Sequence, residues 1–139
     1  MRINLIEIHR ADIPFRPVSG APLRTWQDSS PVIIARLSTD TDLTGVGTAT
    51  AIGFYLGLTG GALADTATAL APLLLGLSPF DIERAHGLMD HLMRGNQAVK
   101  AAFDLALHDL MGQAIGQPAY NLLGGRTRPS RCRPPCPIP

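Results

Sequence analysis

The chain has few cysteines, and their positions exclude two classes of protein. Its only two cysteines, Cys132 and Cys136, both stand among the last eight residues. Two thiols in a C-x3-C spacing do not make a disulfide framework of the kind that stabilises small secreted domains. No histidine follows His108, so the pair also lacks the partners of a zinc site. We expect both thiols to be incidental.

Long apolar runs are also missing. The longest such stretch, LAPLLLGL at residues 70–77, is far shorter than the ~20 residues of a membrane span. The first residues, MRINLIEIHRADIP, alternate in polarity, which is not the pattern of a secretory signal. We therefore expect a cytoplasmic protein that makes no contact with a membrane.

Charge is scarce and unevenly distributed. Charged residues make up 17% of the chain and the net charge is +1, but residues 126–139 hold four arginines and no acid. The preceding 125 residues therefore carry a net −3, which gives no electrostatic basis for a nucleic-acid partner. The arginines are interspersed with prolines, a composition that predicts a disordered tail at 126–139.

The apolar and polar pattern first predicts strands. Residues 3–9, 32–39 and 44–51 have the β-branched and apolar composition of strands, and a turn at 40–43 makes the last two a hairpin. Gly45 and Gly47 within the third strand predict a bulge or a close approach of another backbone. A Pro-, Gly- and Ser-rich segment at 11–31 predicts a long loop between the first two strands.

Helical patterns follow the strands. They cover residues 61–76, interrupted by Pro72, then 78–93, 95–118 and a short turn at 119–125. Ser78 is expected to be the N-cap of the second helix and Asn96 to cap the third, which Gly116 ends. Strands followed by helices predict an α+β domain at 1–125, in which a three-stranded antiparallel meander is followed by a three-to-four-helix bundle.

Three segments in this order resemble a known family. They are VIIARLSTDTDLTGVGTATA at 32–51, LAPLLLGLSPFDIE at 70–83 and GNQAVKAAFDLALHDLMGQAIGQPAYNLLGG at 95–125. Together they resemble the N-terminal capping domain of the enolase superfamily, in its mandelate racemase and muconate-lactonizing branch. Within that branch the chain looks most similar to dipeptide epimerases acting on Ala-Glu-type substrates. Muconate cycloisomerases, acyl-amino-acid racemases and hydroxyproline dehydratases share much of the pattern, and Thr48 stands where relatives commonly have an acid.

The resemblance implies chemistry that this chain does not hold by itself. In the family, a TIM barrel after the cap carries three carboxylates that bind Mg²⁺ and the lysines that act as bases. This chain has one lysine, Lys100, within a cap helix. A barrel needs roughly 200 more residues, whereas 14 follow Gly125. We therefore expect a fragment truncated before the barrel, with no cofactor of its own and no catalysis alone.

The resemblance also implies a substrate-specificity element. In the family, the loop after the first strand covers the barrel mouth, which makes Arg16, Arg24 and Trp26 candidates for substrate contact. An arginine can bind a carboxylate in a bidentate manner, which suits a dipeptide or another carboxylate held between cap and barrel. Thr59 is a further candidate on a second loop. The alternatives are solvated loop arginines and, for Thr59, a helix N-cap.

The remaining histidines do not form a recognisable metal or catalytic site. His86 and His91 are five residues apart and do not share a helix face as metal ligands would, and the adjacent His108 and Asp109 point in different directions. The expected barrel-facing surface of the cap is apolar, which predicts self-association. A rival hypothesis is a stand-alone binding or scaffold module that uses the Pro-rich tail at 126–139 as a ligand.

Overall fold

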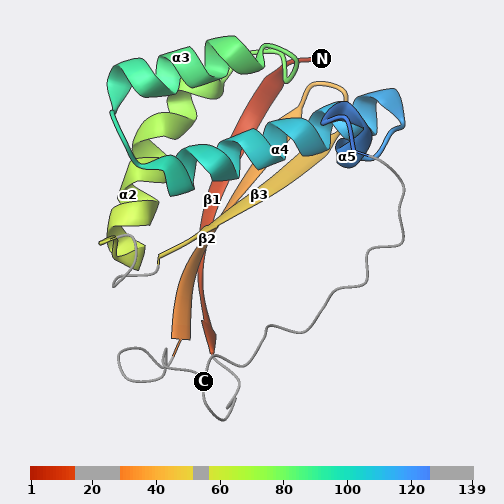
Figure 1. The fold of residues 1–139 in the computed structure, drawn as a ribbon. Coiled ribbons are helices and arrows are strands. Elements are labelled where there is room, and N and C mark those ends of the chain that lie inside the picture. Colours follow the sequence, from red (N-terminus) through yellow and green to blue (C-terminus); the bar gives the residue numbers. More distant parts are fainter. Residues whose placement is uncertain (15–28, 52–56, 126–139) are drawn as a thin grey trace.

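Three strands form one antiparallel sheet (Figure 1). The computed structural model describes residues 1–14, 29–51 and 57–125. Strands β1 (Ile3–Pro14), β2 (Ser29–Thr39) and β3 (Thr44–Thr50) lie in chain order, each antiparallel to the next. The turn between β2 and β3 is closed by a hydrogen bond of 3.0 Å from the Thr39 amide to the Leu43 carbonyl. The predicted meander is confirmed.

The first two strands are longer than the sequence predicted. A loop was expected at 11–31, but β1 continues to Pro14 and β2 begins at Ser29, and these two residues are partners in the register. β3 reaches only as far as Val32 along β2. The ends of β1 and β2 therefore extend beyond the rest of the sheet as a two-stranded ribbon (Figure 1). Cross-strand pairing supplies the stability that the Pro- and Ser-rich composition lacks.

The predicted helices are confirmed, with small differences at their ends. The helical elements are α2 (Gly60–Leu70), the 3₁₀ turn η2 (Ala71–Leu74), α3 (Ile82–Leu92), α4 (Gln97–Ile115) and α5 (Ala119–Leu122). Pro72 stands in η2, directly after the end of α2, as a helix-breaking residue should. Gly116 ends α4 in the left-handed conformation, with φ of +65°.

The expected N-caps of α3 and α4 differ from the observed ones. Ser78 does not begin α3. Its hydroxyl accepts a hydrogen bond of 3.3 Å from the Phe80 amide in a preceding turn, and Asp81 occupies the N-cap position. Asn96 does occupy the N-cap position of α4, but it has a left-handed backbone and its side chain accepts no capping bond. Its amide instead donates to the Arg94 carbonyl at 3.4 Å.

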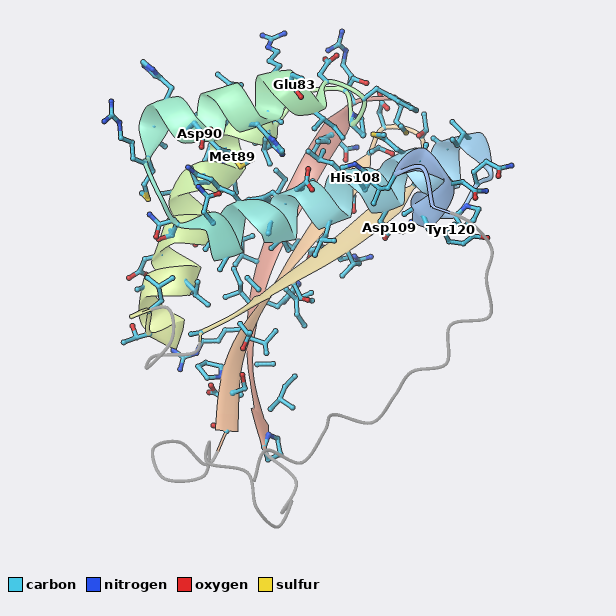
Figure 2. All side chains as sticks on the ribbon, in the orientation of Figure 1. Glu83, Met89, Asp90, His108, Asp109 and Tyr120 are labelled. Atoms are coloured by element: carbon cyan, nitrogen blue, oxygen red, sulfur yellow. The ribbon has the colours of Figure 1, made fainter. Side chains whose placement is uncertain are left out.

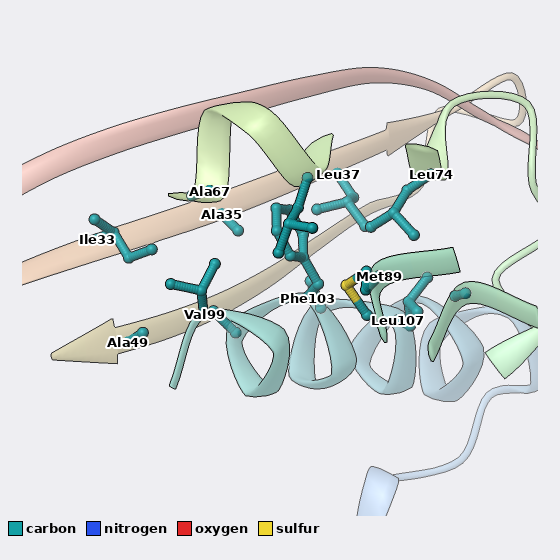
Figure 3. Close-up of a cluster of buried hydrophobic side chains, with 14 of the residues drawn as sticks. Ile33, Ala35, Leu37, Ala49, Ala67, Leu74, Met89, Val99, Phe103 and Leu107 are labelled. Atoms are coloured by element: carbon teal, nitrogen blue, oxygen red, sulfur yellow. The ribbon is translucent and has the colours of Figure 1, made fainter. Parts of the chain in front are cut away.

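Helix α4 packs very closely on the sheet. A side chain at Gly45 or Gly47 would overlap the carbonyl oxygens of Ala106 and Ala102, so glycines on β3 opposite alanines on α4 allow the two backbones to approach. The close approach predicted for these glycines is thus confirmed. Figure 3 shows Phe103 and Val99 extending from α4 into the core. The fully buried large side chains include Ile33, Leu37, Leu63, Leu70, Leu74, Met89, Val99, Phe103, Leu107 and Leu110.

The opposite face of the sheet is more exposed. Along β2, Ile33, Ala35 and Leu37 are buried under the helices, whereas Ile34 and Arg36 between them are not. In the described part of the chain the buried residues of all three strands lie on this one face. Leu5, Ile13 and Val46 on the other face are 50%, 53% and 45% exposed. Self-association through such a surface stays a prediction.

Candidate functional site

The ribbon formed by β1 and β2 fixes where the predicted substrate loop begins and ends. Arg16, Arg24 and Trp26 lie outside the described residues. The pairing of Pro14 with Ser29 brings the two ends of the segment 15–28 together at the tip of the ribbon. The candidate loop is therefore anchored at both ends to one end of the sheet.

Thr59 stands at the start of α2, where it is the N-cap. Its hydroxyl oxygen accepts a hydrogen bond of 3.2 Å from the Ala62 amide, and its carbonyl accepts another, of 3.1 Å, from Leu63. This is the structural role that the sequence left open for this residue. Thr59 is nevertheless exposed to solvent. Its contact with a substrate stays a prediction.

The start of α2 lies against the ribbon. A Cβ added to Gly60 would lie 2.6 Å from the Cβ of Pro31 on β2 and 3.3 Å from the guanidinium carbon of Arg10 on β1. The end of β3 is joined to the same place, because the Ala51 amide donates to the Pro31 carbonyl at 3.0 Å. Thr59 and the two ends of segment 15–28 therefore lie at the same end of the sheet. The sequence did not single out Arg10, which lies between the strand expected at 3–9 and the loop expected at 11–31.

A second polar group lies between α3 and α4. The Lys100 ammonium donates to the Asp90 carboxylate at 2.6 Å and to the Met93 carbonyl at 2.5 Å. The Lys100 side chain is 7% exposed and that of Asp90 is 66% exposed. The hydrogen bond from Lys100, followed by its positive charge, lowers the pKa of Asp90. Desolvation opposes this shift, and His86 adds a smaller lowering effect.

Two histidines continue this polar group on either side of Asp104. His86 Nε2 on α3 donates to the Asp104 carboxylate at 2.8 Å. His108 Nδ1, one turn further along α4, donates to the Asp104 carbonyl at 2.9 Å, so this nitrogen carries a proton. Asp104 therefore has histidines from both α3 and α4 as its partners. Figure 2 labels Asp90 on α3 and His108 on α4.

A cavity of about 300 Å³ lies at this cluster. It is lined by His86, Met89, Asp90, Gln97, Lys100, Ala101 and Asp104. The Lys100 ammonium is already bonded to Asp90, and the Asp104 carboxylate to His86, which is the arrangement of a structural network rather than a poised base. The sequence offered no signal for it, because the partners are 10 and 18 residues apart.

The described residues do not provide a magnesium site. Within residues 1–14, 29–51 and 57–125, no group of three or more His, Cys, Asp or Glu side chains is placed to hold a metal ion. His91 and His86 do not form a common metal site. His108 donates to the Asp104 carbonyl, whereas Asp109 accepts from the Val46 amide. The donor set of these described residues therefore does not fit the three-carboxylate site that the resemblance implies for a barrel. No helix in the same residues combines the length and the apolarity needed to cross a membrane.

Comparison with known proteins identifies the family to which this fold belongs. The family model described as the mandelate racemase / muconate lactonizing enzyme, N-terminal domain, matches residues 6–124. The chain therefore belongs to the mandelate racemase/muconate lactonizing enzyme family and contains its N-terminal domain.

Sequence relatives come from several activities within this family. The chain is 33% identical to an N-succinyl-L-Arg/Lys racemase of Bacillus cereus, covering 91% of this chain and 34% of that protein. It is 32% identical to a hydrophobic dipeptide epimerase of Enterococcus faecalis, covering 90% and 35%. It is 35% identical to muconate cycloisomerase 1 of Pseudomonas putida, covering 93% and 35%. The chain thus spans about a third of the length of these relatives.

A solved structure gives the same result in three dimensions. The dipeptide epimerase from Enterococcus faecalis V583, complexed with Mg and the dipeptide L-Leu-L-Tyr, superposes with a TM-score of 0.83 at 33% identity. The match covers 90% of this chain and 35% of that chain. The predicted cap-domain fold and the family resemblance are confirmed.

Proposed function

We propose that this chain is the substrate-capping domain of a magnesium-dependent racemase, epimerase or cycloisomerase, and that it catalyses no reaction without a barrel domain. The observation that carries the proposal is the match of residues 6–124 to the N-terminal domain of the family. The chemistry of the chain supports it. Its single lysine is buried and bonded to Asp90, so it is not available as a base.

The substrate that we favour is a dipeptide. The support comes from the epimerases among the relatives and from the arginines of segment 15–28, since an arginine fork suits a carboxylate side chain. N-acyl amino acids and muconate-type acids are the alternatives offered by the other relatives. All three classes carry a carboxylate.

The position of the candidate residues supports a shared substrate surface. Thr59 and both ends of the segment that holds Arg16, Arg24 and Trp26 lie at one end of the sheet. A domain that presents two loops from one end can close a pocket on another domain with few contacts elsewhere. We propose that these two loops contribute the cap side of the substrate pocket.

A domain exchange tests this function. Residues 1–125 of this chain would replace the matching N-terminal segment of the Enterococcus faecalis dipeptide epimerase, and epimerisation with Mg²⁺ would be followed for hydrophobic and acidic dipeptides. The full 139-residue chain is assayed in parallel with the same substrates and metal. We expect turnover by the chimera, with a changed dipeptide preference, and none by the chain alone.

Two results would contradict the proposal. One is turnover above background by the purified 139-residue chain. The other is a chimera that is folded and binds Mg²⁺ but processes no dipeptide, N-succinyl amino acid or muconate. The unmodified epimerase, purified in the same way, is the positive control.

A further inference from the structure

The two edge strands of the sheet are protected differently. Because the order is β1-β2-β3, β1 and β3 each have one side that no other strand of the sheet covers. An open edge presents N–H and C=O groups to which a strand of another molecule can pair. Natural sheets avoid this with charged residues, prolines or bulges on the edge strand.

β1 carries such protection in its own sequence. Glu7, Arg10, Asp12 and Pro14 are distributed along it, and its register shifts between Ile3 and Leu5. β3, with the sequence TGVGTAT, has no charged residue and no proline. An uncharged strand of small and β-branched residues is well suited to pair with a copy of itself, because no like charges would meet.

Two side chains of α4 occupy the outer edge of β3. Asp109 accepts a hydrogen bond of 3.0 Å from the Val46 amide, and Gln113 donates one of 2.8 Å to the Thr44 carbonyl. The two residues are four apart on α4, so they share one side of the helix. They satisfy an outward N–H and an outward C=O in the way that a neighbouring strand would. The glycine-mediated approach of α4 to β3 brings them within reach.

We propose that the outer edge of β3 is a latent strand-pairing surface for a second copy of this chain, and that Asp109 and Gln113 keep it closed. The pairing would be antiparallel and two-fold symmetric, with each β3 contributing the same groups. Thr48 has the same strand parity as Thr44 and Val46, so its amide also points away from β2. Thr48 lies beyond Thr44 and Val46, the two residues bonded by Gln113 and Asp109, and its amide would donate a hydrogen bond to the second copy.

The test measures self-association of the full chain by sedimentation velocity over a concentration series. Asp109→Ala/Gln113→Ala should strengthen dimerisation at least about tenfold relative to the unmodified chain, since two edge groups are released at once. Asp109→Asn keeps an oxygen for the Val46 amide and should behave like the unmodified chain. Asp65→Ala removes a negative charge from an exposed position on α2 and controls for net charge.

A third change identifies the surface. Adding Thr48→Pro to the double variant removes the outward donor without removing a bond to β2, and should restore the weaker association. The Thr48 side chain also lies on the exposed face of the sheet, because Thr48 pairs with Ile34. Thr48→Ala in the same background changes that face but keeps the amide, and it should leave the added association unchanged. The exposed Gln113 allows a single Gln113→Ala variant with an intact fold, in which we expect a smaller shift in the same direction.

The proposal is overturned if the folded double variant associates no more strongly than Asp65→Ala. It is also overturned if Thr48→Pro leaves the added association unchanged. Should the double variant fail to fold, an unchanged dimerisation constant for Gln113→Ala decides against the proposal.

Discussion

The Lys100 ammonium lies 2.6 Å from the Asp90 carboxylate, and this contact joins the first turn of α4 to the last turn of α3. The same ammonium donates to the carbonyl of Met93, which is the C-terminal cap residue of α3. A cation at the end of a helix also interacts favourably with the helix dipole. The only lysine of the chain therefore has a structural role that accounts for its burial.

Replacing Lys100 should destabilise the domain. Lys100→Met keeps much of the apolar volume but leaves the Met93 carbonyl without its donor, and we expect a loss of about 1–3 kcal/mol in the free energy of unfolding. The measurement is urea denaturation at pH 7. Arg94→Met removes an exposed positive charge from the same connection and should change stability by less than about 0.5 kcal/mol. Equal effects of the two variants would contradict the role of Lys100.

The same pair predicts how stability depends on pH. Lys100 lowers the pKa of Asp90 in the folded chain. A carboxylate with a lowered folded pKa adds stability above its unfolded pKa, and that stability is lost as the pH falls through the folded pKa. Asp90→Asn should therefore be less stable than the unmodified chain at pH 7. The difference should shrink as the pH falls below about 4.

Thermal unfolding of both proteins from pH 7 to pH 2 measures this difference. The carboxylate of Asp90 is exposed, so salt should reduce the difference at pH 7. A stability difference that stays constant across the acid range would show that the ionised Asp90 contributes nothing.

The close approach of α4 to β3 predicts opposite effects for two glycines. Gly47→Ala would force a Cβ onto the Ala102 carbonyl, and we expect a loss of about 1–3 kcal/mol in stability. Gly87 lies within α3, where an added Cβ would meet open space, and Gly87→Ala should increase stability by about 0.5–1 kcal/mol. Chemical denaturation of the two variants measures both. A neutral Gly47→Ala would show that α4 can move away from the sheet without cost.

Local sequence patterns were sufficient for most of this fold. The helical spacing within 95–118 predicts an apolar stripe of Val99, Phe103, Ala106, Leu107, Leu110 and Ala114. The first five are buried, whereas Ala114, near the end of α4, is exposed. Gly45 and Gly47 were also identified as positions of a bulge or a close approach, and the structure shows the close approach. Both signals are local, since a short window of residues contains the whole pattern.

Features that depend on distant partners could not be obtained in this way. Pro14 and Ser29 look like loop residues until their cross-strand pairing is known. Ser78 has the right side chain to begin a helix, but its hydroxyl instead binds the Phe80 amide in a turn. The contacts of Lys100 with Asp90 and of Asp109 with Val46 join elements that no single window spans. The substrate contacts of the candidate loop residues stay predictions for the same reason.

Thr59 allows its structural and substrate roles to be separated. Thr59→Ala removes the N-cap of α2 and should cost about 1 kcal/mol of stability, whereas Thr59→Asn keeps a capping oxygen and should be nearly neutral. If Thr59 also contacts the substrate, Thr59→Asn in the epimerase chimera should raise KM while the melting temperature stays unchanged. Thr59→Ser preserves the hydroxyl and serves as the control. An unchanged KM for Thr59→Asn would leave Thr59 with its N-cap role alone.

Arg24 tests the proposed recognition of an acidic substrate. In the chimera, Arg24→Ala should lower kcat/KM for acidic dipeptides by about 10–100-fold more than for neutral ones, because one charge-assisted pair of hydrogen bonds is lost. Arg24→Lys keeps the charge without the bidentate fork and should recover only part of this difference. Arg94→Ala is the control, since it removes the same charge from an exposed position between α3 and α4 that has no proposed contact with the substrate. Equal losses for acidic and neutral dipeptides in Arg24→Ala would refute a carboxylate clamp, because a general loss indicates altered loop packing rather than recognition of a charge.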